Sequence, residues 1–190
     1  MKEGLIKDTY ELIIKEIQTV VTVSYIVTVG IGMLFNYQKY SEFEINIFDY
    51  SDVFDFLIAP FSDFYILLLA TASILSISVL TKLDTLWKNK MPNFFSKANF
   101  GLDKKSWYKT YRIVIIIICF IIYLYLSANY YERYTRDKII KQNDISIKLA
   151  DNEIKSGKLI GKTKDVIFLL KGANVYAIPI SSLVKEIKIK

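Results

Sequence analysis

Residues 113–131 read IVIIIICFIIYLYLSANYY, a run of 19 residues without a charge. An α-helix rises about 1.5 Å per residue, so about 20 predominantly apolar residues cross the hydrocarbon core of a bilayer. Two further stretches reach that length, and residues 64–81 of the second carry no charge. The sequence therefore predicts an integral membrane protein with a bundle of three transmembrane helices, at 17–37, 56–81 and 113–131.

A soluble domain is the alternative interpretation for a chain of 190 residues of which 53% are hydrophobic. A soluble helix of this length normally carries a polar stripe for its solvent-exposed face, and the three apolar stretches are not patterned in this way. The first stretch also differs from a secretory signal peptide, because an acidic segment precedes it and it lacks a small-residue cleavage site.

The first span is flanked by two segments of different character. Residues 1–16 predict a short amphipathic helix, which either lies on the membrane or a subunit, or simply extends the first span, as we favour. Gly30 and Gly32 near the end of the span permit close approach of another helix. The connector at 38–55 carries five carboxylates, but it lacks the spacing and the turn glycine of a Ca²⁺-binding EF-hand loop. We therefore expect an exposed acidic loop.

The second span contains small residues on one helical face. Ala72 and Ser76 are four residues apart, so they form a shallow groove that suits packing against another helix. A conduction path in an oligomer is the sharper alternative for this face. Asp63 lies near the start of the span, where we expect it at the membrane interface rather than inside the bilayer.

The loop at 82–112 is basic and aromatic. We expect this loop to lie on anionic lipid headgroups, and we prefer lipid over nucleic acid as its partner because the loop joins two spans. The predicted headgroup contacts are Lys88, Lys90, Lys97, Lys104, Lys105, Trp87 and Trp107.

The distribution of Lys and Arg predicts an orientation. The N-terminal segment and the 82–112 loop together carry 11 such residues close to the spans, against five in the connector and just after the third span. Basic residues prefer the cytoplasmic side. We therefore expect a multi-pass protein of the cell (inner) membrane with a cytoplasmic N-terminus and a C-terminal domain outside the cytoplasm.

After a charged linker at 132–143, the pattern changes to short alternating strands. Five strands at 144–190, with a hairpin turn at 171–174 and a 3₁₀ turn at 180–183, predict a small all-β barrel of the SH3-like or Sm-like type. A domain of about 46 residues is too small to stabilise itself, so we expect it to lean on other subunits, on the membrane surface or on a partner protein.

The stretch 157–183 contains GKLIG, then VIFLLKGANVYAIPISSL. It resembles the Sm-like β domain that follows the third span in small-conductance mechanosensitive channels, where a Val-x-Ile-Pro-x-Ser-x-Leu segment follows a hairpin. The resemblance implies a barrel and, as an alternative function, a mechanosensitive-type ion channel. The third span lacks the alternating Gly and Ala of that family's pore helix. The overall plan is similar to small multi-span proteins of bacterial antiviral systems, by analogy alone.

Enzyme chemistry finds little support in the sequence. The chain has no histidine and a single cysteine, Cys119, which excludes Ser-His-Asp and Cys-His catalysis. Phosphate-binding glycine motifs and Cys-x-x-Cys metal spacing are also absent. We expect a non-enzymatic protein without cofactor or metal that forms a homo-oligomer. Its basic β domain would sense or dock a partner and bias the helices; a membrane anchor for a soluble partner protein is the alternative.

The predicted orientation is testable with one engineered cysteine. In a Cys119→Ser background, Lys164→Cys should react in intact cells with a thiol reagent that does not cross membranes. Labelling that occurs only after permeabilisation would place the C-terminal domain in the cytoplasm and contradict the prediction.

Overall fold

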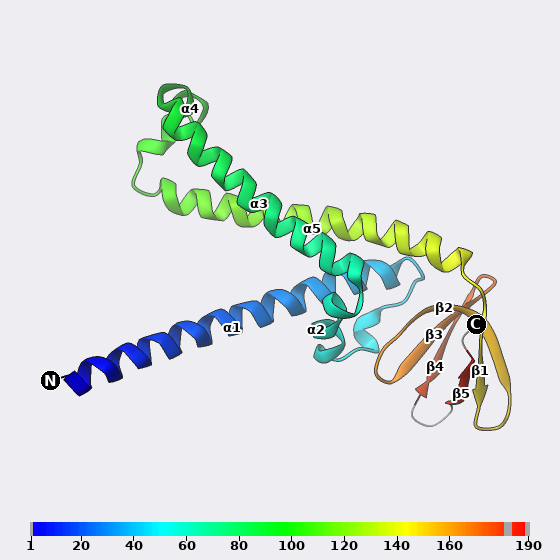
Figure 1. Cartoon of the computed structure of the whole chain (residues 1–190). Helices are drawn as coiled ribbons and strands as arrows, with labels where there is room; N and C mark the ends of the chain where they lie inside the picture. Colours follow the sequence, from blue (N-terminus) through cyan, green and yellow to red (C-terminus); the bar gives the residue numbers. More distant parts are fainter. Residues whose placement is uncertain (1, 181–183, 189–190) are drawn as a thin grey trace.

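The three predicted spans correspond to three long helices in the computed structural model (Figure 1). The structure describes residues 2–180 and 184–188, with side chains from residue 16 to residue 180. Helices long and apolar enough to cross a membrane cover Glu16–Ser41, Phe64–Lys90 and Tyr108–Lys141. The chain is thus a helical bundle followed by a small β-sheet. Its helical elements are α1 (Lys2–Ser41), η1 (Ile47–Asp49), α2 (Val53–Ser62), α3 (Phe64–Lys90), α4 (Pro92–Ala98), η2 (Leu102–Lys104) and α5 (Tyr108–Lys141).

Residues 2–41 form one continuous helix. This is the arrangement expected if the N-terminal segment extends the first span. The side chains that would form the apolar face of the predicted amphipathic helix at 1–16 lie outside the described ones. The segment predicted as a linker, 132–143, is mostly helical as well, because α5 continues to Lys141. Thr135 and Ile139 are buried on this last part of α5, so tertiary contacts hold a charged stretch in the helix.

The helix α3 begins at Phe64, eight residues after the start of the predicted span at 56–81. A separate helix, α2, precedes it and begins with a capping box in which the Asp52 carboxylate accepts from the Asp55 backbone N–H at 3.0 Å. Asp63 then adopts an extended backbone and accepts from the Tyr65 backbone N–H at 2.9 Å, which caps α3. The two helices are distinct because one aspartate ends the first and begins the second.

The helices pack closely only at the end near the sheet. Their shared core is formed by Ile31, Phe35, Ile66, Ala70, Leu124, Ala128 and Tyr131. Farther away, α1 diverges from α3 and α5, and its residues 16–27 are exposed (Figure 1). At the opposite end, α3 and α5 are joined by the ion pair of Asp84 with Arg112. The chain alone therefore leaves half of α1 without a helical neighbour.

The sheet contains five antiparallel strands in the order β4-β3-β2-β1-β5. The strands are β1 (Ile145–Leu149), β2 (Ile154–Lys162), β3 (Val166–Lys171), β4 (Asn174–Pro179) and β5 (Val184–Lys188). The first half of β2 pairs with β1 and the second half with β3. The predicted hairpin turn between β3 and β4 is present, with Gly172 at φ +62°.

The predicted closure into a barrel is wrong for the described residues. β4 and β5 are the two edges of the sheet and do not pair with each other, so the sheet is open. One face of the sheet forms its own small core of Ile147, Leu149, Ile167, Leu169 and Ile178. On the other face, Ile160 and Phe168 are buried by the connector, α2 and the ends of α1 and α5, which take the place of facing strands. The predicted 3₁₀ turn falls mainly on residues 181–183, outside the described part of the chain.

A pair of glycine substitutions tests the contact between α1 and α2. A Cβ atom at Gly32 would overlap the Phe56 carbonyl oxygen, whereas nothing lies within 4 Å of one at Gly30. Gly32→Ala should therefore lower the stability in detergent by about 1–3 kcal/mol. Gly30→Ala should leave it unchanged or slightly raised, because alanine favours a helix over glycine. Equal melting temperatures for the two variants would contradict the close contact.

Candidate functional site

The sheet is attached to the helices by one apolar cluster, which we call the junction. Five segments contribute to it: α1, the connector after it, α2, the end of α5 and the sheet. In such a cluster, no segment can move far without disturbing the contacts of the others. The buried members are Tyr40, Ile45, Ile47, Phe56, Ile139, Ile160 and Phe168.

Phe168 on β3 lies at the centre of the junction. Its ring forms two edge-to-face pairs. One is with Tyr40 from α1, at a distance of 5.4 Å between ring centroids, and the other is with Tyr50 from the connector, at 5.2 Å. Edge-to-face pairs of this kind add to the free energy gained by burial alone. Gly161 on β2 lies so close to Tyr40 that a Cβ there would overlap the tyrosine hydroxyl. The strand can approach α1 only because residue 161 has no side chain.

Hydrogen bonds reinforce the junction on both sides of this cluster. The Gln142 side chain donates to the Leu159 carbonyl at 2.6 Å, and the Lys158 ammonium donates to the Ile140 carbonyl. On the α2 side, the backbone N–H of Lys164 donates to the Asp55 carboxylate at 3.1 Å. The sheet is therefore fixed both to the end of α5 and to the start of α2.

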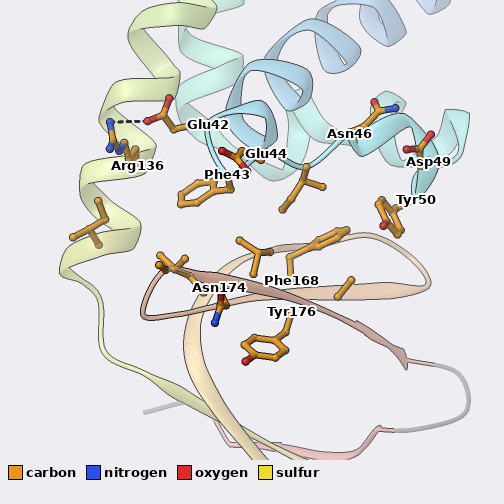
Figure 2. Close-up of a pocket in the computed structure, with 16 residues that line it drawn as sticks. Glu42, Phe43, Glu44, Asn46, Asp49, Tyr50, Arg136, Phe168, Asn174 and Tyr176 are labelled. Atoms are coloured by element: carbon orange, nitrogen blue, oxygen red, sulfur yellow. Dashed lines mark ion pairs between the residues drawn. The ribbon is translucent and has the colours of Figure 1, made fainter.

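A groove of about 930 Å³ lies beside the junction, between the connector and the outer face of β3 and β4 (Figure 2). We call it the connector groove. Its apolar wall includes Phe43, Ile45, Phe168, Leu170, Val175 and Ala177. Its rim carries the carboxylates of Glu42, Glu44 and Asp49. Only Glu42 forms an ion pair with another described residue, to Arg136 at 2.6 Å, so the groove is acidic.

The connector groove reaches the free edge of the sheet. Phe168 and Leu170 pair with Ala177 and Val175, so these four residues share the face toward the connector. Tyr176 belongs to the opposite face, and Figure 2 shows its ring pointing away from the connector. The groove is lined by Tyr176 as well, as expected where a wall continues around the edge of β4. An edge strand has backbone groups free to pair with another chain.

The chemical character of the connector groove follows from its wall, its rim and the strand edge beside it. The described residues contain no group of three or more His, Cys, Asp or Glu side chains placed to hold a metal ion. The groove combines an apolar wall, an acidic rim and an unpaired strand edge. Together these features can hold an extended, positively charged segment.

Three residues predicted from the sequence, Asp63, Gly30 and Gly32, lie near the junction. The second Asp63 oxygen accepts from the Tyr131 hydroxyl at 2.7 Å, which ties the start of α3 to α5. Gly32 is buried against the α2 backbone at Phe56. Gly30, two residues away, faces outward from the bundle, with open space around it. The three residues therefore lie in three different environments and do not form one site.

The small residues of α3 differ in how deeply they are buried. Ala70 and Ser73 are buried, and Ser73 donates to the Leu69 carbonyl at 2.7 Å. They belong to the side of α3 that meets α5, where Ser127 and Ala128 are also buried. Ala72 and Ser76 are half-buried. A conduction path along them stays a prediction.

The basic loop lies at the end of the molecule away from the sheet, around α4 (Figure 1). Its side chains predicted to contact headgroups, Lys88, Lys90, Lys97, Lys104, Lys105, Trp87 and Trp107, are all exposed. Trp87 stacks edge-on against Phe95 at 5.5 Å, and Trp107 against Tyr111 at 5.6 Å. These residues are spread along one end of the molecule, and none of them lines the connector groove.

The connector groove was not predicted. Its acidic rim was recognised in the sequence, but its wall comes from strands more than 100 residues later in the chain. The one available signal was the alternation within 166–177, where Phe168, Leu170, Val175 and Ala177 add a second apolar face to the strands. The chain matches no family model, no curated protein and no solved structure.

A rescue experiment tests the contact of β2 with α1. Gly161→Ala should loosen the sheet by about 1–3 kcal/mol, because the new methyl group meets the Tyr40 hydroxyl. Adding Tyr40→Phe removes that oxygen and should restore part of the loss. Hydrogen exchange of the β2 amides measures the effect, since it reports local opening. Tyr40→Phe alone, which removes the hydroxyl group and adds no methyl group, is the control. Failure of Tyr40→Phe to slow the exchange of Gly161→Ala would contradict the contact.

Proposed function

We propose that this protein is a non-enzymatic, self-associating membrane sensor. A partner protein docks a segment in the connector groove, and the sheet transmits this event to the helices. The observation that supports the proposal most is the composition of the junction, in which α1, α2, α5 and the sheet share one apolar cluster. A ligand that favours one packing of this cluster over another shifts the population of the helix arrangements by its difference in affinity.

The groove favours an extended basic segment as the ligand. Glu44 and Asp49 on its rim have no ion-pair partner among the described residues, so cationic side chains would find complementary charge there. The free edge of β4 can accept main-chain hydrogen bonds from an added strand. The apolar wall around Phe168 then supplies burial for alternate side chains of that strand.

Self-association is supported by α1. On the outward side of α1 lie Ile26, Gly30, Met33 and Tyr37. These residues have the spacing of one helical face, and all four are exposed. Farther toward the N-terminus, residues 16–25 are exposed all round the helix. In a membrane, such a helix associates through close packing, which a glycine facilitates. A second copy of α1 is the partner that this face suits.

A membrane anchor is the alternative that the same groove supports, because holding a partner requires no change in the helices. A role in antiviral defence stays a prediction from the overall plan. The sensor and the anchor differ in one property, which is whether the junction influences contacts between copies.

Cross-linking between copies in liposomes tests both parts of the proposal. In a Cys119→Ser background, Ile26→Cys and Met33→Cys should form disulfide-linked dimers, because they lie on the outward side of α1. Ile31→Cys, on the buried side, should not. Adding Gly161→Ala, which disturbs the junction, should change the yield at Ile26→Cys severalfold.

The control dilutes the protein with excess lipid, which removes random collisions but preserves a specific dimer. Equal yields at positions 26 and 31 would contradict a defined contact through α1. A yield at position 26 that does not respond to Gly161→Ala would exclude coupling and leave the anchor as the function.

A further inference from the structure

A second cavity, of about 680 Å³, lies on the α2 side of the junction. We call it the interfacial pocket. It is enclosed by the last turns of α1, by α2, by the first turn of α3 and by the turn between β2 and β3. The proposed function does not use this pocket, and no residue that lines the connector groove also lines it.

The pocket lies at the level where the apolar spans end. Lys39 is the one basic residue in the last turn of α1, and Asp63 caps the start of α3. Tyr131 is the last residue of α5 before the charged stretch that begins with Glu132. All three line the pocket. In a bilayer, these positions correspond to the boundary between the acyl chains and the headgroups.

Three ammonium groups surround the pocket, from Lys39, Lys162 and Lys164. None of them forms an ion pair with a described residue. Lys39 is half-buried, and its nitrogen lies 5.0 Å from the centre of the Tyr40 ring. The same nitrogen is 3.0 Å from the point where a Cβ of Gly161 would lie, which places it beside the end of β2. Lys39 therefore lies beside the strand that leads to Lys162 and Lys164.

The two carboxylates of the pocket already have hydrogen-bond donors. Asp55 accepts from the backbone N–H groups of Lys164 and Asp52, each at 3.1 Å. Asp63 accepts from the Tyr131 hydroxyl at 2.7 Å and from the Tyr65 backbone N–H at 2.9 Å. The pocket carries three lysines against two carboxylates that already accept hydrogen bonds, so its net charge is positive and it suits an anion.

The remaining wall is apolar and continues onto the surface of α2. Ile58, Ala59 and Ile66 line the pocket. Phe54, Ile58 and Phe61 of α2 are each more than half exposed. A helix of 10 residues is too short to span a bilayer, and this one lies where the spans end, so its exposed apolar face suits immersion in the membrane interface. The pocket therefore joins a cationic side to an apolar side that faces lipid.

We propose that the interfacial pocket binds the headgroup of one anionic phospholipid. The lipid phosphate lies among the ammonium groups of Lys39, Lys162 and Lys164, and an acyl chain runs along Ile58 and Ile66. Lysine binds phosphate as a point charge, so the three need no bidentate geometry. A soluble phosphate would use the cationic side only and leave the apolar wall unfilled.

Titration of short-chain phosphatidylglycerol onto the full-length protein in a neutral detergent tests the proposal, with binding read by native mass spectrometry. The wild type should bind one such lipid in preference to the corresponding phosphatidylcholine. Replacing Lys39, Lys162 and Lys164 with glutamine should weaken phosphatidylglycerol binding roughly 100-fold, since each lysine near an anionic surface contributes about a fivefold factor. Lys162→Gln with Lys164→Gln, which changes exposed residues only, should weaken it roughly 25-fold.

A matched control changes Lys141, Lys155 and Lys171 to glutamine, which removes the same charge at positions outside both the pocket and the basic loop. This control variant should bind phosphatidylglycerol with the same affinity as the wild type. Equal affinity in the wild type and both pocket variants would overturn the proposal, as would equal losses in the pocket and control variants. Inorganic phosphate at millimolar concentration should not displace the lipid; displacement would show a site for a soluble anion and overturn the lipid assignment.

Discussion

The attachment of the sheet to the helices is the constraint on which the rest of the structure depends. The sheet is too small to bury a sufficient core of its own, and its inner face holds only a handful of aliphatic residues. The second face becomes useful because Phe168 finds Tyr40 and Tyr50 opposite it. In such a structure, the stability of the sheet depends on how the ends of the helices are arranged.

That dependence explains why both cavities lie where they do. The sheet meets the helices through a compact cluster, and the surfaces on either side of it remain open. One opening is acidic and borders the edge of β4; the other is cationic and borders the apolar side of α2. The same contact therefore separates a region suited to a protein segment from a region suited to a lipid.

The sequence was sufficient for the features that depend on local pattern. Long uncharged runs identified the three spans, and alternation with Gly172 identified the β3–β4 hairpin. Prediction from the sequence failed where contacts between distant segments determine the structure. The charged residues at 132–141 are helical because Thr135 and Ile139 are buried in the structure, which no local pattern reveals. The expected place of Asp63 at the membrane interface stays a prediction. Its role as a cap that separates two helices was missed, although the preceding Asp52 and Asp55 formed a recognisable capping signal.

The open sheet was missed for a related reason. Whether five strands close depends on what covers their outer face, and here the connector and the ends of the helices bury Ile160 and Phe168. In α3, Ala70 and Ser73 are buried whereas Ala72 and Ser76 are half-buried, because neighbouring helices set the rotation of a helix and several small residues in sequence permit more than one rotation.

The length of α5 has a mechanical consequence. With 34 residues it is a rod of about 50 Å, continuous from the basic loop to within four residues of β1. It is held near its middle by the contact of Leu124 and Ala128 with α1 and α3, and at its start by Arg112. A rigid helix held near its middle turns as one body, so a sideways displacement of one end is accompanied by an opposite displacement of the other end.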